Sequence, residues 1–205
     1  EYRQRTIDDL ETLIGEWNGL STGFLGTPHI CHVLRDNGRV DAAYRLLTKT
    51  EYPSWLYPVT KGATTVWEHW DGIMENGGFW SADMNSFNHY AYGAIGEWMY
   101  RAMAGIEADP EHPGFKHAIL YPRIGGNLKY TAGKYHSIYG DVGVKWEVQG
   151  KQITLTVQIP VNTTAEIRLD QAKAVLESDG LTFTREADYM AAEAGSGTYH
   201  IAFEQ

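Results

Sequence analysis

A change of hydrophobic pattern near residue 110 constrains the fold more than any other feature of the sequence. Before this point, apolar residues recur at three- and four-residue steps, which is the spacing of one helix face. After Pro113, short segments alternate between apolar and polar residues or are rich in β-branched residues, as strands are. Helices followed by strands predict an α+β chain with two separate parts rather than an interleaved parallel sheet. We expect a helical part at residues 1–112 and an antiparallel β part at residues 113–205.

The first part has helical periodicity at residues 8–14, 30–35, 39–48 and 86–106. The second and third of these stretches are predicted to form a helical hairpin, because Asn37-Gly38 is a break between them. The fourth stretch predicts the longest helix. Ser86 is suited to be its N-cap, and Asp109-Pro110 is expected to end it.

The second part has strand-like patterns at residues 118–121, 129–138, 143–148, 152–159, 164–169, 172–178 and 198–203. Gln149-Gly150-Lys151 predicts a hairpin turn between two of these segments. Residues 185–197 have no such pattern, and we expect a loop there.

Composition and charge exclude several classes of protein. The formal net charge of −9 argues against binding to a nucleic-acid backbone, which requires a basic surface. No apolar run approaches the roughly 18 residues that span a bilayer, so no membrane partner is expected. The single cysteine, Cys31, allows neither an intrachain disulfide nor a cysteine metal cluster.

The N-terminal residues, Glu1-Tyr2-Arg3-Gln4-Arg5, contain neither an initiator methionine nor a signal pattern. We therefore expect the chain to be a piece of a longer protein. A targeting signal would then lie outside this sequence, so cytoplasmic, periplasmic and secreted locations all stay open.

Polar and aromatic residues concentrate between residues 62 and 89 beyond what a core requires. The chain has 7 Trp and 13 Tyr, and rings with polar tips suit sugars, although they equally fill cores and interfaces. Glu68 stands between Trp67 and His69-Trp70. A carboxylate flanked by indole rings loses part of its hydration, which makes it a better base. On spacing alone, a solvated surface glutamate is the alternative.

Asn88-His89 stands at the predicted start of the long helix, where His89, Gly93 and Gly96 share one face. Small residues on that face would let a ligand or another backbone approach closely. A histidine on a helix is also commonly a buried one with a structural role, and the pattern does not separate the two.

Other kinds of catalytic or binding site find little support. His29 and His32 are three residues apart but have no third ligand, so no metal is predicted. The sequence has no Gly-x-Ser-x-Gly elbow, and Cys31 has no evident activating partner, which argues against a Ser or Cys nucleophile.

Four segments in order resemble the bacterial α-L-rhamnosidases of glycoside hydrolase family 78. They are residues 22–28 (TGFLGTP), 52–57 (YPSWLY), 62–71 (GATTVWEHWD) and 86–94 (SFNHYAYGA). The tail segments PGF at 113–115 and YPR at 121–123 resemble the family's passage into its C-terminal β domain. Each motif is weak by itself, but their order and approximate spacing match over nearly the whole chain.

The resemblance implies the C-terminal portion of an (α/α)6 barrel at residues 1–112, followed by an antiparallel β-sandwich domain at residues 113–205. It implies inverting hydrolysis of terminal α-L-rhamnosides without a cofactor. The partner would be a rhamnose-containing glycoside or polysaccharide.

Individual roles follow from the matched motifs. In such enzymes the glutamate of the Thr-Thr-x-Trp-Glu motif is the general base, and that position is Glu68 here. The histidine of the Asn-His-Tyr motif lines the sugar pocket, and that position is His89. From their places beside these two residues, Trp67, Trp70 and Asn88 are expected to contact the substrate as well.

One half of the catalytic pair is absent from this sequence. An inverting glycosidase needs two carboxyl groups roughly 6.5–9.5 Å apart. The family's general acid lies in an upstream acidic motif with Arg and Trp, which this chain lacks. We therefore expect the upstream catalytic half of the same enzyme as a partner, and an isolated chain that is inactive.

Two other interpretations stay open. A different (α/α)6 carbohydrate hydrolase, such as a trehalase-like or debranching enzyme, would also place carboxylates among aromatic rings. Alternatively, the β part or the whole chain is a non-catalytic carbohydrate-binding or structural module, a question that fold alone does not decide.

Overall fold

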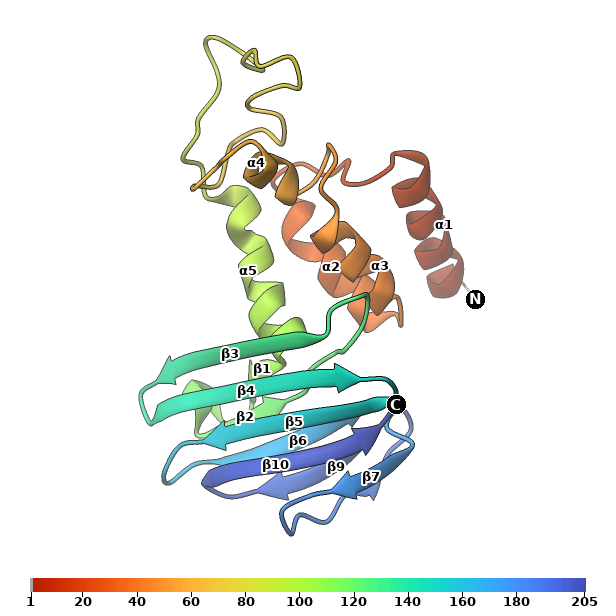
Figure 1. The fold of residues 1–205 in the computed structure, drawn as a ribbon, viewed down its shortest axis with the longest axis vertical. Helices are drawn as coiled ribbons and strands as arrows, with labels where there is room; N and C mark the ends of the chain where they lie inside the picture. The colour runs from red at the N-terminus through yellow and green to blue at the C-terminus, as the bar shows by residue number, and fades with distance from the viewer. Residues whose placement is uncertain (1) are drawn as a thin grey trace. The chain divides into compact units, whose positions relative to one another are not determined.

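The computed structural model describes residues 2–205, and the chain divides into two compact units (Figure 1). The first unit ends at Trp98, and the second runs from Met99 to Gln205. The α-helices lie in the first unit and the β-strands in the second, so the predicted α+β class is confirmed. Within the described residues, no helix combines the length and the apolar character that crossing a membrane requires.

The α-helices of the first unit are α1 (Tyr2–Glu16), α2 (Thr27–Asp36), α3 (Val40–Thr48), α4 (Leu56–Thr60) and α5 (Ile95–Trp98). The predicted hairpin is confirmed as α2 and α3. Gly38 in its turn has φ 74°, a left-handed conformation that residues with a Cβ rarely adopt. The hairpin buries Leu34, Ala43 and Tyr44 almost completely, and the Tyr44 ring meets the Trp98 ring of α5 edge-on at 5.2 Å.

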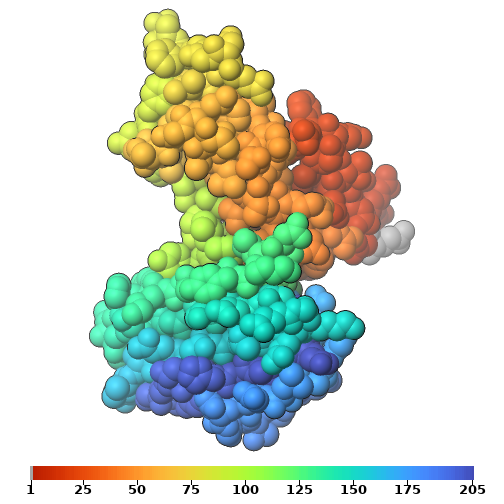
Figure 2. Space-filling model, in the orientation of Figure 1, coloured from red at the N-terminus to blue at the C-terminus, as the bar shows by residue number. Residues whose placement is uncertain are grey.

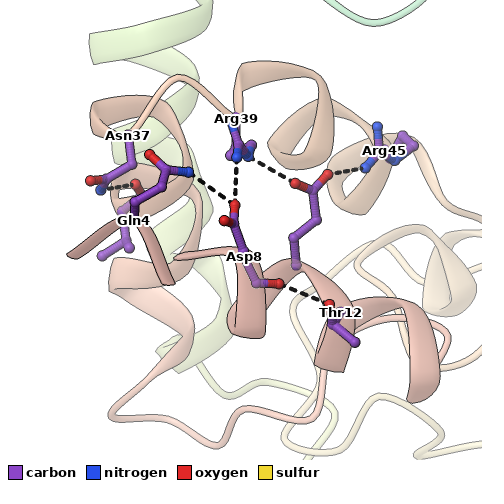
Figure 3. Close-up of polar contacts among 8 residues, drawn as sticks. Gln4, Asp8, Thr12, Asn37, Arg39 and Arg45 are labelled. Atoms are coloured by element: carbon purple, nitrogen blue, oxygen red, sulfur yellow. Dashed lines mark hydrogen bonds and ion pairs between the residues drawn. The ribbon is translucent and has the colours of Figure 1, made fainter. Parts of the chain in front are cut away.

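Polar contacts join α1 to the α3 region, as Figure 3 shows. Asp8 Oδ1 lies 2.6 Å from Arg39 Nη2, and the Glu11 carboxylate lies 2.9 Å from both Arg39 Nε and Arg45 Nη2. The hydrogen bond from Arg39 holds the pKa of Asp8 below its usual value. Ile7 is the buried residue of α1. Helix α1 therefore relies largely on exposed ion pairs, each of which contributes little to stability.

The long helix predicted at residues 86–106 begins later than expected. A 3₁₀ turn, η1 (Ala91–Ala94), leads into α5. Ser86 is not an N-cap, and Asn88 and His89 precede the helix. The reason is that backbone groups of Ser86 and His89 bond to residues 66 and 68, so they are not available for helical hydrogen bonds.

The helical run also ends earlier than Asp109-Pro110, where its end was predicted. A π-helical segment, η2 (Met99–Ala104), is followed by Gly105 with φ 74°. A Cβ on Gly105 would lie 2.1 Å from Pro122 N, so only glycine fits this close approach. The chain then enters β1 (Ile106–Ala108).

The second unit contains two five-stranded sheets. The first has the order β1, β2 (His117–Leu120), β6 (Thr164–Asp170), β9 (Tyr189–Ala194) and β8 (Thr184–Arg185). The second has the order β3 (Tyr130–Ser137), β4 (Gly140–Gln149), β5 (Gln152–Ile159), β10 (Gly197–Glu204) and β7 (Ala174–Glu177). A 3₁₀ turn, η3 (Pro113–Phe115), precedes β2. The strands predicted from the sequence and the hairpin turn between β4 and β5 are confirmed.

Both sheets contribute to one hydrophobic core. Leu120, Ile167 and Leu169 of the first sheet belong to it, together with Trp146 and Leu155 of the second. Trp146 is fully buried, and its Nε1–H donates to the Met103 carbonyl at 2.8 Å. Alternate residues along β5 are buried, which is the period-two pattern that identified this strand.

The strands differ from the expectation in three ways. The β2 and β6 strands pair in parallel, with Leu120 opposite Ile167, so the β part is not wholly antiparallel. Residues 185–197, expected as a loop, contain β9. Its alanine-rich sequence has little intrinsic preference for a strand, but β9 pairs with β6 along its length, and such pairing decides strand formation. β1 also precedes residue 113, because it pairs with β2.

The central position of β6 predicts an asymmetric response to two leucine substitutions. Leu169→Ala should lower the free energy of unfolding by about 2–5 kcal/mol, because it removes buried methyl groups and leaves a cavity. Leu176→Ala is the matched control on edge strand β7, where the side chain is 50% exposed, and should change stability by less than about 0.5 kcal/mol. Urea unfolding followed by far-ultraviolet circular dichroism measures both, and equal losses would contradict the core described above.

Candidate functional site

Two backbone segments pair at the base of the loop formed by residues 61–90, which Figure 2 shows in yellow at the surface of the first unit. The Glu68 N–H donates to the Ser86 carbonyl at 2.8 Å, and the His89 N–H donates to the Val66 carbonyl at 2.8 Å. The Thr65 hydroxyl also donates to the Phe87 carbonyl. Two motifs that lie about twenty residues apart in the sequence are thereby brought side by side.

The Glu68 carboxylate takes part in this pairing. The Ser86 N–H donates to Glu68 Oε2 at 2.8 Å, so each of the two residues donates a backbone hydrogen to the other. The side chain is half-buried. No hydrogen bond to Oε1 is found in the part of the chain that the structure describes. The backbone donor of Ser86 therefore holds one of the two carboxylate oxygens of Glu68.

A hairpin at residues 72–80 continues the chain after Glu68. Met74 N–H donates to the Gly78 carbonyl at 2.8 Å, and Trp80 N–H donates to the Gly72 carbonyl at 3.2 Å. A Cβ on Gly72 would lie 3.1 Å from Trp67 Cε3, so the indole packs tightly against the base of the hairpin. Asp71-Gly72 is therefore part of a turn.

Trp67 and Trp70 are buried in aromatic clusters. The Trp70 ring stacks on Tyr92 at 3.7 Å, and Trp55 meets it edge-on at 5.6 Å. Trp67 packs edge-on against Phe87 at 5.0 Å. The exposed fractions of Trp67 and Trp70 are 5% and 8%. Both indoles therefore pack inside the first unit and support the loop of residues 61–90. Their contact with a substrate stays a prediction.

His89 lies against residues 22–28, the first of the four segments that carry the resemblance. Its ring stacks on Phe24 at 4.7 Å with an interplanar angle of 17°. Asn88 is exposed, and its N–H donates to the Ser86 hydroxyl at 3.2 Å. The structure thus brings Glu68, Asn88 and His89 together through the paired segments.

One aromatic residue of this loop was not singled out from the sequence. The Trp80 ring stacks on His69 at 3.7 Å, yet Trp80 remains 43% exposed. Its neighbour Phe79 is 61% exposed. The sequence signal that could have identified Trp80 is the pair of adjacent aromatic residues directly after Gly77-Gly78. Aromatic residues in a polar loop seldom belong to a hydrophobic core.

Cysteine and metal chemistry are not supported by the residues described. Burial raises the pKa of the Cys31 thiol to about 12, so it stays protonated at neutral pH. Within residues 2–205, no group of three or more His, Cys, Asp or Glu side chains is arranged to hold a metal ion.

Two family models match this chain. Residues 1–103 match the bacterial α-L-rhamnosidase six-hairpin glycosidase domain, and residues 105–183 match the bacterial α-L-rhamnosidase C-terminal domain. The two matches meet at Ala104, one residue before the glycine that ends the helical run.

Individual relatives agree with these models. The chain is 45% identical to an α-L-rhamnosidase of Streptomyces avermitilis over 97% of its own length, and 42% identical to one of Formosa agariphila over 85%. The crystal structure of the Streptomyces avermitilis enzyme complexed with L-rhamnose matches 95% of this chain with a TM-score of 0.88 and 43% identity. The chain spans only 19% of the length of each of these proteins.

The hydrogen bond between Ser86 and Glu68 can be tested by amide exchange. Glu68→Ala removes the acceptor of the Ser86 N–H, so this amide should exchange with solvent roughly tenfold faster, since a hydrogen bond to a charged group contributes about 1.5–3 kcal/mol. Glu68→Gln keeps an oxygen in place and should change the rate little. Exchange is followed by nuclear magnetic resonance, with Glu75→Ala in the same loop as control. An unchanged Ser86 rate in Glu68→Ala would contradict the contact.

Proposed function

Because the chain belongs to the bacterial α-L-rhamnosidases, we propose that it is the C-terminal part of an inverting glycoside hydrolase that removes terminal α-L-rhamnose from rhamnosides. The observation that carries this proposal is the oriented carboxylate of Glu68, held at Oε2 by the Ser86 N–H. In the proposed enzyme a rhamnose-containing glycoside or polysaccharide is the substrate, and no cofactor is required.

The proposed architecture is the end of an (α/α)6 barrel at residues 1–112, followed by a β-sandwich at residues 113–205. The α2–α3 hairpin supports the first assignment, since antiparallel helix pairs are the building unit of such barrels. Two sheets around one core support the second. Because β1 pairs with β2, the proposed β domain also includes residues 106–108, which precede residue 113.

In this proposal Glu68 is the general base. Oε1 accepts a proton from a water molecule, which attacks the anomeric carbon from the face opposite the leaving group. Holding Oε2 on a backbone amide keeps the carboxylate in one orientation during this step. The second carboxyl group, the general acid, would stand roughly 6.5–9.5 Å away and is assigned to a segment upstream of this chain.

His89, Asn88, Trp67 and Trp70 are the proposed substrate-binding residues. The stacking of His89 on Phe24 supports a fixed imidazole orientation. Asn88 is exposed directly beside the Glu68 segment, where its amide can bond to a sugar hydroxyl. For the buried Trp70, the proposed contact is with the edge of the ring, because Tyr92 stacks on its face.

The proposed partner is the upstream catalytic half of the same enzyme. Large apolar side chains of the first unit that are mostly exposed support it: Leu25 is 91% exposed, and Tyr90 is 88% exposed. Apolar surface of this kind is commonly covered in a complete protein. The chain spans only 19% of the length of its Streptomyces avermitilis relative, which is consistent with such a partner.

In the full-length protein, Glu68→Gln should lower kcat roughly 10²–10⁴-fold, because it removes the base while keeping the size of the side chain and the bond to Ser86. Hydrolysis of an aryl α-L-rhamnoside measures the loss. Glu75→Gln, an exposed glutamate of the same loop, is the matched control and should retain activity. Full activity of Glu68→Gln would sink the assignment of the base.

The 205-residue chain by itself should not turn over p-nitrophenyl-α-L-rhamnoside, because it supplies one of the two required carboxyl groups. The measurement is the release of p-nitrophenol over hours, with the full-length protein run in parallel. Turnover by the isolated chain at the full-length rate would show that the general acid lies within these residues.

A further inference from the structure

We propose that a cavity in the second unit, lined mainly by residues with polar side chains, binds a neutral saccharide, an interaction that goes beyond the proposed hydrolysis. The cavity has a volume of about 600 Å³ and lies where β2 and β6 begin and β9 ends. Side chains from three separate loops line it, including those of His112, His117, Lys116, Glu193 and Ser196. A volume in this range accommodates a sugar of one or two rings.

Hydrogen bonds between the loops form this cavity without a ligand. The Lys116 ammonium donates to the Asn162 carbonyl at 2.5 Å, and the Thr164 N–H donates to the Lys116 carbonyl at 3.2 Å. The Asn162 N–H donates to the Ser196 hydroxyl at 3.3 Å. The start of β2, the β5–β6 turn and the β9–β10 turn are thereby tied together. A binding site that is already formed loses little conformational entropy when it binds.

The two imidazoles of the cavity are each fixed at Nδ1. His112 Nδ1 lies 2.8 Å from Asp109 Oδ2, and His117 Nδ1 lies 2.7 Å from the Thr164 hydroxyl. Because the Asp109 carboxylate can only accept, neutral His112 carries its proton on Nδ1 and offers Nε2 as an acceptor. The two rings lie 5.7 Å apart, so they present separate groups rather than one shared point.

Donors and acceptors in the cavity are mixed, which suits hydroxyl groups. Glu193 lines the cavity, and its side chain has no hydrogen-bond or ion-pair partner among residues 2–205, so its carboxylate is available as an acceptor. Lys116 and Ser196 retain hydrogens to donate. A sugar hydroxyl both donates and accepts, so neighbouring hydroxyls match this alternation.

Other ligand classes fit the cavity less well. Asp109 and Glu193 place two carboxylates beside one lysine, which disfavours an anion such as phosphate or sulfate. The described residues form no group that could hold a metal ion. An apolar ligand would cover charged groups such as Lys116 and Glu193 without replacing their hydration, which is costly.

The test is a titration of the ¹⁵N-labelled 205-residue chain with L-rhamnose and D-galactose, followed by amide chemical shifts. We expect saturable shifts at His117, Asn162 and Ser196. Glu193→Ala should weaken binding roughly tenfold or more, since it removes a hydrogen bond to a charged group. Glu177→Ala, an exposed glutamate of edge strand β7, is the matched control and should leave the affinity unchanged. The dispersion of the spectrum verifies that each variant is folded.

Three results would overturn this proposal. They are an absence of shifts at the cavity with both sugars, shifts at the cavity with inorganic sulfate but not with sugars, and an unchanged affinity in Glu193→Ala. Shifts confined to residues 61–90 would count against the cavity while leaving the proposed hydrolytic site intact. Conversely, loss of the Glu68 assignment would leave sugar binding at the cavity unaffected.

Discussion

The reciprocal pairing of Glu68 with Ser86 is the interaction on which the candidate site depends. Each residue donates its backbone hydrogen to the other, one to a carbonyl and one to a carboxylate. This arrangement joins two motifs across a loop that contains no regular sheet, and the same bonds fix the side chain that we propose as the general base. The buried indoles of Trp67 and Trp70 also stabilise the loop, so the orientation of the Glu68 carboxylate and the local folding depend on neighbouring contacts.

The sequence predicted the elements whose own residues decide their conformation. Strand β5 was located because its alternation matches its burial, and the α2–α3 hairpin because Asn37-Gly38 interrupts an apolar stripe. It failed where tertiary contacts override local preference. Residues 86–89 have helical spacing, but their backbone groups are used by another segment. The alanines of β9 have little intrinsic preference for a strand, and pairing with β6 is what makes this segment a strand.

The same distinction applies to the site. Glu68, Asn88 and His89 could be selected from the sequence because motifs identify residue types, and the structure brings their segments together. The stacking of Trp80 on His69 could not be predicted from the sequence, because it depends on the geometry of the hairpin at residues 72–80. Motif order predicts which residues meet, whereas ring contacts between them depend on turn geometry.

The parallel pair of β2 and β6 has a consequence for how the second unit assembles. Parallel neighbours need a long crossover, and here the crossover consists of β3, β4 and β5, which belong to the opposite sheet. The pairing of β2 with β6 in the first sheet therefore joins segments that are separated in the sequence by three strands of the other sheet. Contacts that are so distant along the chain favour slow folding. The β3–β4–β5 meander, by contrast, consists of neighbouring antiparallel strands joined by short turns, whose closure costs little chain entropy.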